Sequence, residues 1–442
     1  MARLHWCIAF IALIIAVALA NNSNAQTSAS KPLGELRVLY VGSERADDYT
    51  SFLKEFVGQI ESVSRADFQA KQSFAFDVIL LDWPQGEETR EMRLLRSPLG
   101  AREEWSRPTV LLGSAGLNLA VAWKLQGGSG CTCMDPMAYG FRDHEIFKYP
   151  NEIQLSSQIR IKTPEAFAGE LLEKEIEVLP LVDDYQKTWR AGWCTYSNFF
   201  DKNPDVEYFC GGVNHKTPTA AGLWRQGNLL HFGFEQSPSE MNQHGKRLLL
   251  NSIAYISRFS QDRPIATTPS VFGGEVARPR RTPGAWLKRD DRPVDWVLDM
   301  FQAKVRTQLE LLKTNAAKAA WCDENSRYFA PGPDKLLGID EDLQSIALAF
   351  DAPEFFERVL NDLGLNESES VDRSRRLLDR YVPCGPGRDA SVSNWRDWHK
   401  LNKSYLFALD TGDYCWYVDN LAKSRKVPSS ELRGPIRADT SN

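Results

Sequence analysis

Residues 107–125, RPTVLLGSAGLNLAVAWKL, carry the main sequence signal for the fold of this chain. It begins with a short apolar run, Thr109–Leu112, which is typical of a buried parallel strand. The turn Gly113-Ser114-Ala115-Gly116 and a helical segment follow, and the two glycines permit a sharp bend and a close backbone approach. In an open α/β sheet such a turn lies at the edge where ligands bind. The sequence therefore predicts a ligand site bordered by Gly113, Ser114 and Gly116.

Strands and helices alternate on both sides of this stretch. Leu36–Gly42 and Phe76–Asp82 are apolar runs that predict further buried strands, and Asp48–Ser62 between them has helical spacing. Later in the chain, Leu223–Phe234 predicts a β-hairpin and Asn242–Phe259 an amphipathic helix. This alternation predicts an α/β fold of the flavodoxin-like, doubly wound type, with a mostly parallel sheet.

The 442 residues leave room for more than one domain. We expect the α/β domain to span residues 35–260. Residues 261–285, rich in proline, glycine and arginine, read as a linker. The rest, residues 286–442, predicts a mainly helical domain of unknown function, in which Val294–Trp321 has the spacing of one long helix.

The N-terminus has the pattern of a secretory signal peptide, residues 1–25. Arg3 and His5 precede the apolar run Cys7–Ala20, and small residues suited to cleavage follow. An uncleaved membrane anchor is the alternative, but the run is short for a span and no later stretch is apolar enough to cross a bilayer. The sequence therefore predicts a secreted or periplasmic protein. A net charge of −5 gives no indication of a nucleic-acid partner.

Seven cysteines remain after the predicted leader. An oxidising compartment favours disulfides, and the odd number leaves at least one cysteine over. Cys194 with Cys210 is the pairing that we expect first. The alternative, a metal cluster, is disfavoured because the chain has no pair of CxxC motifs.

The order of these elements resembles the class I glutamine-amidotransferase-like fold and, within it, the trehalose-utilisation (ThuA-like) branch. GLWRQGNLLHFGFEQSP at 222–238 and GKRLLLNSIAYI at 245–256 carry the resemblance, and DHEIF at 143–147 falls where that branch has a short aromatic-acidic motif. The resemblance implies a nucleophilic cysteine in the turn and a His–Glu pair after the last strand. Here Ser114 stands at the nucleophile position, and Gly233-Phe234-Glu235 keeps the glutamate without the histidine. Because a serine nucleophile needs an adjacent base, this departure from the family pattern predicts that amidotransferase activity is absent.

Our first hypothesis is a protein that binds a carbohydrate or related polyhydroxylated ligand, with weak catalysis or none. Asp82 ends a predicted strand, so its carboxylate would face the same crevice as the turn. The crevice would lie over Gly42, Asp82, Ser114 and Glu235. Ser114 is also explained simply as a small residue that fits a tight turn, and Asp82 as a helix cap.

Asp143 and His144 are further ligand-binding candidates, in the densest polar cluster of the sequence. With His215, His231 or His244 they have the residue types of a divalent-metal site, but adjacent residues rarely all point into one site. We therefore expect no metal, and the sequence indicates no cofactor.

Two other functions remain open. In the first, Ser114 is the nucleophile of a hydrolase, with His231 as base and Glu235 as its partner. Because side chains alternate along a strand, His231 and Glu235 share one face only if Gly233 causes no bulge. In the second, the chain is a cell-envelope protein whose helical domain binds a partner.

Overall fold

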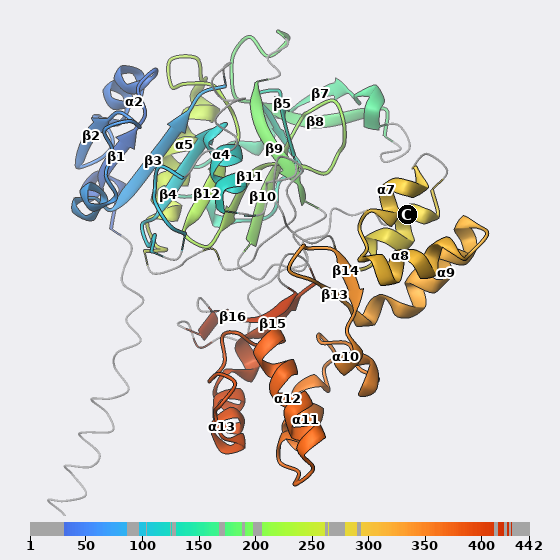
Figure 1. Cartoon of the computed structure of the whole chain (residues 1–442). Helices are drawn as coiled ribbons and strands as arrows, with labels where there is room; N and C mark the ends of the chain where they lie inside the picture. Colours follow the sequence, from blue (N-terminus) through green and yellow to red (C-terminus); the bar gives the residue numbers. More distant parts are fainter. Residues whose placement is uncertain are drawn as a thin grey trace, which may run out of the picture.

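The computed structural model describes residues 31–85, 97–102, 104–123, 125, 130–167, 173–187, 191–197, 206–260, 264, 279–289, 293–410, 414–419, 422–423 and 426. The predicted signal peptide and most of the predicted linker lie outside these ranges. In Figure 1 a lobe built on one large sheet stands beside a second, helical lobe. Each lobe has its own cluster of buried apolar side chains.

Five strands form the parallel half of the sheet and lead to the candidate site. Their order is β2 (Gln59–Val63), β1 (Arg37–Val41), β3 (Val78–Trp83), β4 (Thr109–Gly113) and β12 (Leu229–Phe232). Each pairs in parallel with its neighbours. Every residue of β3, β4 and β12 is buried, as expected of strands covered on both faces.

Antiparallel strands extend the sheet beyond β12. They follow in the order β11 (Ala220–Gln226), β10 (Val206–Gly212), β6 (Met137–Tyr139), β8 (Glu175–Pro180) and β7 (Ile159–Lys162). The strands β5 (Gly130–Met134) and β9 (Gly192–Tyr196) pair with each other, and β9 joins the edge of β11. The expected α/β architecture is therefore confirmed with a mixed sheet, and β11 and β12 are the expected hairpin.

Helices cover both faces of the parallel half (Figure 1). The helix α4 (Ala115–Trp123) packs with Leu111 on one face, and α5 (Gln243–Ile256) packs with Leu112 on the other. The expected helix Asp48–Ser62 is wrong in its second half. The helix α2 (Ala46–Leu53) ends early because the following residues form β2 and pair with β1.

The second lobe is mainly helical, but the predicted long helix Val294–Trp321 is wrong. The chain breaks after α7 (Val294–Leu298), because Phe301 forms a bridge with Leu337 in place of another helical turn. The lobe consists of α6 (Thr282–Leu287), α7, α8 (Ala303–Glu310), α9 (Asn315–Asn325), α10 (Glu341–Ser345), α11 (Phe355–Leu363), α12 (Ser368–Tyr381) and α13 (Val392–Asn402), with the strand pairs β13 (Phe329–Pro331)–β14 (Leu337–Ile339) and β15 (Leu406–Leu409)–β16 (Cys415–Val418).

The expected Cys194–Cys210 disulfide is also wrong. Cys210 is a free, buried thiol in β10, whereas Cys194 lies in β9, and β11 runs between these two strands. Burial raises the pKa of the Cys210 thiol above its ordinary value. Among the described residues, no helix is both long and apolar enough to cross a membrane.

Candidate functional site

The register of the parallel strands brings most of the predicted site residues to one edge of the sheet. Leu112 at the end of β4 lies opposite Phe232 at the end of β12, and Gly113 lies opposite Trp83 of β3. The turn after β4 and the segment after β12 therefore leave the sheet at the same carboxyl edge. The edge gathers Gly42, Asp82, Gly113, Ser114 and Glu235.

Gly113 lets a carboxylate lie directly over the turn. Its φ of +51° is in the left-handed region, and a Cβ there would lie 2.1 Å from Oε2 of Glu235. Any larger residue would be strained and would displace the carboxylate. The turn is shorter than expected, since α4 begins at Ala115 and Gly116 already belongs to the helix.

Asp82 belongs to a charge network that crosses three strand ends. Its carboxylate accepts hydrogen bonds from two guanidinium nitrogens of Arg45, with Nε at 3.0 Å from Oδ2, and from the Tyr40 hydroxyl. Arg45 also donates to the backbone carbonyl of Glu235. We call Tyr40, Arg45, Asp82, Gln85 and Glu235 the rim cluster. The Arg45–Asp82 ion pair fixes the loop after β1 against the end of β3, and the bond from Arg45 to the Glu235 carbonyl ties both to the segment after β12.

Glu235 is the least satisfied member of the rim cluster. Oε1 accepts from the Gln85 backbone N–H at 2.5 Å and lies 3.9 Å from a guanidinium nitrogen of Arg45, whereas Oε2 is buried and has no hydrogen-bond partner. Burial raises the pKa of Glu235 to about 7, although Arg45 and the N–H groups of Gln85 and Ser114 act in the opposite direction. A carboxyl group whose pKa is shifted to near neutrality is typical of functional sites.

This raised pKa predicts a pH dependence of stability. Between pH 4.5 and 7 the folded protein holds a proton on Glu235 that the unfolded chain releases, so the free energy of unfolding falls as pH rises. A shift from 4.5 to about 7 corresponds to roughly 3 kcal/mol, fully lost above pH 7. In urea unfolding across pH 4.5–8, Glu235→Gln should therefore gain stability relative to wild type as pH rises. A difference between the two that is constant with pH would contradict this.

His231 does not join Glu235. It lies opposite Leu111, and therefore on the α4 face of the sheet, where a Cβ on Gly116 would be 2.7 Å from its Nδ1. Its ring stacks on Trp224 with 3.6 Å between centroids. Neither ring nitrogen has a partner, and burial lowers the pKa of His231 to about 3. The imidazole is neutral across the physiological range.

Ser114 is fully buried at the start of α4. Its hydroxyl has no hydrogen-bond partner, so neither His231 nor Glu235 accepts its proton in this arrangement. Asn118 on the same helix and the Trp193 indole N–H are likewise buried without partners. The turn thus carries polar groups that protein atoms leave unsatisfied.

Asp143 and His144 lie away from the rim cluster. His144 Nε2 is 3.2 Å from Glu207, which pairs across β10 and β11 with Arg225. Arg225 lies opposite Leu230, five residues before Glu235, which places this group roughly 16 Å back along the strands. Asp143 is exposed and pairs with Lys148 at 2.6 Å. Burial opposes the shift, but Arg225 and His144 hold the pKa of Glu207 well below its usual range.

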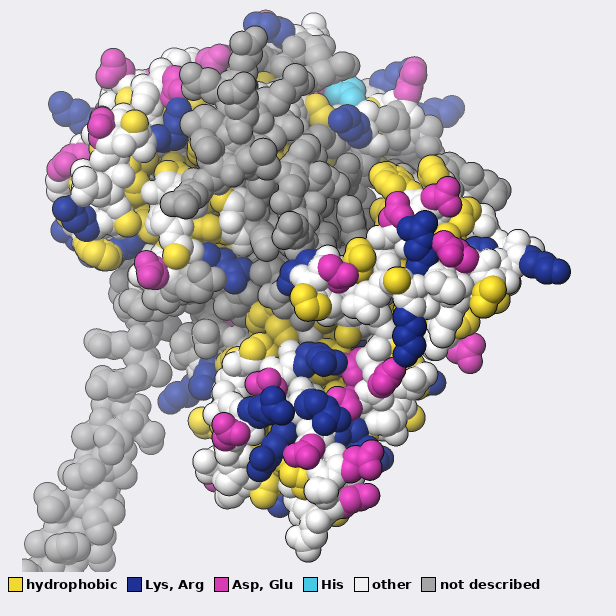
Figure 2. All heavy atoms as spheres, viewed as in Figure 1, with side chains coloured by type: hydrophobic (Ala, Val, Ile, Leu, Met, Phe, Trp, Pro, Cys, Tyr) yellow, Lys and Arg dark blue, Asp and Glu magenta, His cyan; other side chains and the backbone are white. Residues whose placement is uncertain are grey.

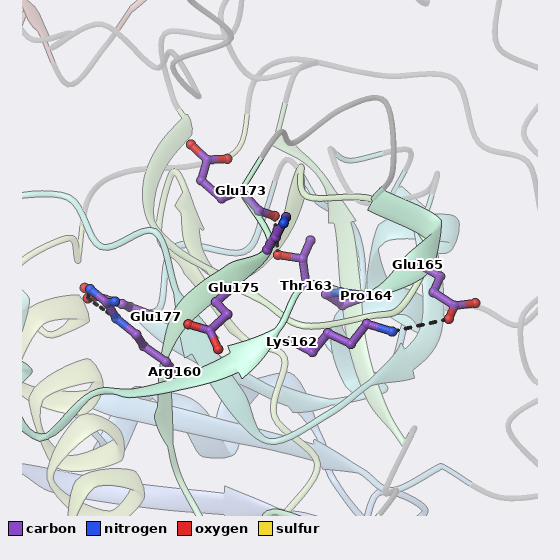
Figure 3. Close-up of a pocket in the computed structure, with 9 residues that line it drawn as sticks. Arg160, Lys162, Thr163, Pro164, Glu165, Glu173, Glu175 and Glu177 are labelled. Atoms are coloured by element: carbon purple, nitrogen blue, oxygen red, sulfur yellow. Dashed lines mark hydrogen bonds and ion pairs between the residues drawn. The ribbon is translucent and has the colours of Figure 1, made fainter.

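A groove along β7 and β8 is the hollow drawn in Figure 3. Its charges are largely matched at the surface, with Arg160 3.2 Å from Glu177 and Lys162 3.6 Å from Glu165. Figure 2 shows acidic and basic side chains interspersed over the second lobe. In the described part of the chain, no group of three or more histidine, cysteine, aspartate or glutamate side chains is placed to hold a metal ion.

Arg45, Tyr40 and Gln85 are members of the rim cluster that the sequence analysis missed. A signal was present, because Arg45 and Gln85 each follow a strand by two to four residues, where loops at the carboxyl edge begin. Tyr40 lies opposite Leu80 in the register of β1 with β3. Asp82 follows Leu80 by two residues, so Tyr40 and Asp82 lie on the same face of the sheet.

No protein-family model and no curated protein matches the sequence. Among solved structures, a GMP synthase-like protein from Thermoplasma acidophilum aligns with 50% of this chain and 94% of its own, at 12% identity and a TM-score of 0.29. A ThuA-like protein from Bacteroides uniformis ATCC 8492 aligns with 52% of this chain and 94% of its own, at 14% identity and a TM-score of 0.28. Similarity at this level says nothing about activity or ligand.

Proposed function

We propose that this protein is a ThuA-like protein without amidotransferase activity, and that it binds a carbohydrate or related polyhydroxylated ligand over the rim cluster. Hydroxyl groups both donate and accept hydrogen bonds, so a polyol matches a surface that combines carboxylate, hydroxyl and guanidinium groups. The location fits as well, because ligands of open α/β sheets bind outside the carboxyl ends of the strands. Gln85 is exposed, and the side chains of Arg45 and Glu235 are partly exposed, at 14% and 12%.

The observation that carries this proposal is a pair of buried polar groups at the turn that have no hydrogen-bond partners. Glu235 Oε2 and the Ser114 hydroxyl are both buried without partners, and Oε2 is the atom that a Cβ on Gly113, the residue before Ser114, would meet. A buried polar atom without a partner costs about 1–3 kcal/mol, so a site that keeps two of them together favours a ligand that fills them. Ligand hydroxyls would donate to Glu235 and Ser114 at once.

A binding function is favoured over a hydrolase because Ser114 has no hydrogen-bonded base. A serine nucleophile needs a hydrogen-bonded base, and neither the Ser114 hydroxyl nor a ring nitrogen of His231 has a hydrogen-bond partner. The carboxylate of Glu235 also lies against the backbone N–H of Ser114, and so occupies a donor of the kind that stabilises a developing oxyanion.

Gly113→Ala tests the location of the site. The added methyl group would occupy the position of Glu235 Oε2, so we expect at least tenfold weaker binding of any sugar that the wild type binds. Isothermal titration calorimetry with trehalose, glucose and the hits of a glycan array measures this. Gly34→Ala is the matched control, because a Cβ there has no atom nearer than 3.9 Å and affinity should be unchanged.

Two results would overturn the proposal. One is the absence of binding across the whole panel at millimolar concentration. The other is covalent labelling of Ser114 in the folded wild type by a phosphonate probe, which would show an activated nucleophile and favour the hydrolase.

A further inference from the structure

The two carboxylates of the rim cluster differ in how their charges are matched. Asp82 receives two guanidinium nitrogens of Arg45 and the Tyr40 hydroxyl, so its charge is paired with that of Arg45. Arg45 reaches Glu235 mainly through the backbone carbonyl, and its nearest approach to the Glu235 carboxylate is 3.9 Å. One cation therefore stands against two carboxylates, and it is committed to Asp82.

Neutral donors alone approach the Glu235 carboxylate closely. The Gln85 N–H lies 2.5 Å from Oε1, and Oε2 has no partner. In the described ranges, Arg45 is the one basic side chain within 4 Å of this carboxylate. The other titratable groups that act on Glu235 or its surroundings are Asp82, which carries the same charge, and Tyr49, whose hydroxyl is buried without a partner.

The unmatched carboxylate is on the open side of the cluster. Asp82 and Ser114 are fully buried, whereas the side chains of Arg45 and Glu235 are partly exposed. A ligand that enters from solvent would thus meet Glu235 before Asp82. In a poorly hydrated site an ammonium group is stabilised by such a carboxylate, a neutral hydroxyl gains much less, and an anion is repelled.

We propose that Glu235 makes the rim cluster selective for an ammonium-bearing ligand, such as an amino sugar, over a neutral or acidic sugar. This inference rests on the proposed function, because it concerns the ligand of the same site. The ammonium group would donate a hydrogen bond to Oε2 of Glu235. Its positive charge would pair with the Glu235 carboxylate, as that of Arg45 pairs with Asp82. Glu235 is thereby a specificity-determining residue and takes no part in a chemical step.

Calorimetric titration with D-glucosamine, D-glucose and N-acetyl-D-glucosamine at pH 7 tests the inference. We expect the wild type to bind glucosamine at least tenfold more tightly than the N-acetyl derivative. Glu235→Gln should abolish this preference, because it should weaken glucosamine binding much more than glucose binding. Glu235→Asp keeps the charge and should keep part of the preference. The control is Glu341→Gln, an exposed glutamate paired with Lys304 in the second lobe, which should behave as wild type.

The number of protons released when the sugar binds gives a second readout. Pairing with an ammonium group favours the ionised form of Glu235, so titrations in two buffers of different ionisation enthalpy should show more proton release for wild type than for Glu235→Gln. Sugar binding without preference, or a preference that survives in Glu235→Gln, would overturn the inference and leave the proposed function intact. If none of the three sugars and no member of the glycan array binds, the proposed function itself fails.

Discussion

Gly233→Ala is expected to destabilise the protein by about 3 kcal/mol or more, the upper range for overpacked sites. A Cβ at this position would lie 2.0 Å from the carbonyl oxygen of Trp193 and 3.0 Å from that of Gly222. Both obstacles are backbone atoms and cannot rotate away. The Gly233 carbonyl also accepts from Trp193 N–H at 2.7 Å, and its own N–H donates to Gly222 at 2.9 Å, so relief of the clash would break the junction of β9, β11 and β12.

Denaturant unfolding of Gly233→Ala and Gly34→Ala measures this effect. A Cβ at Gly34 would make only an ordinary contact, at 3.9 Å from the Phe56 carbonyl oxygen, and its alanine variant should stay within about 0.5 kcal/mol of wild type. The segment that carries Glu235 begins at Gly233, so any folded fraction of Gly233→Ala should also bind sugar more weakly. Equal stability of the two alanine variants would show that β9 can move away from β12 without loss.

The carboxyl edge was predictable from the sequence because its determinants are local. The apolar runs before Asp82 and Gly113 identify buried parallel strands, and the glycines mark the turn. Parallel strands that end in polar residues place those residues at one edge. Asp82 and Gly113 could therefore be grouped without knowledge of any contact, whereas Glu235 was added to them through the family resemblance.

Other features depend on contacts between distant residues. Arg45 is 37 residues from Asp82 and 190 residues from Glu235, so nothing near it in the sequence indicates its role. The face occupied by His231 depends on the register of β12 with β4, and a shift of one residue would reverse it. Similarly, the helical spacing of 294–321 is interrupted by a bridge to Leu337, which no local pattern indicates.

Asp82→Ala has the second large expected effect, a loss of about 3–5 kcal/mol in the free energy of unfolding. The substitution would leave the Arg45 guanidinium mostly buried without its counter-ion and the Tyr40 hydroxyl without its acceptor. Asp82→Asn keeps the shape and one acceptor oxygen, and should lose less. Chemical denaturation with both variants measures the difference. Wild-type stability of Asp82→Ala would mean that solvent replaces the carboxylate at no cost.

Replacing both charges separates folding from ligand binding. In Arg45→Met/Asp82→Leu neither member of the Arg45–Asp82 pair is left buried without the other, so this double variant should be more stable than Asp82→Ala, as apolar replacements of buried ion pairs often are. However, it also lacks the guanidinium that holds the backbone of Glu235 at the edge. If the rim cluster positions Glu235 for a ligand, the double variant should recover stability and still bind sugar at least tenfold more weakly than wild type. A double variant that is stable and binds as wild type would assign the ion pair to folding alone.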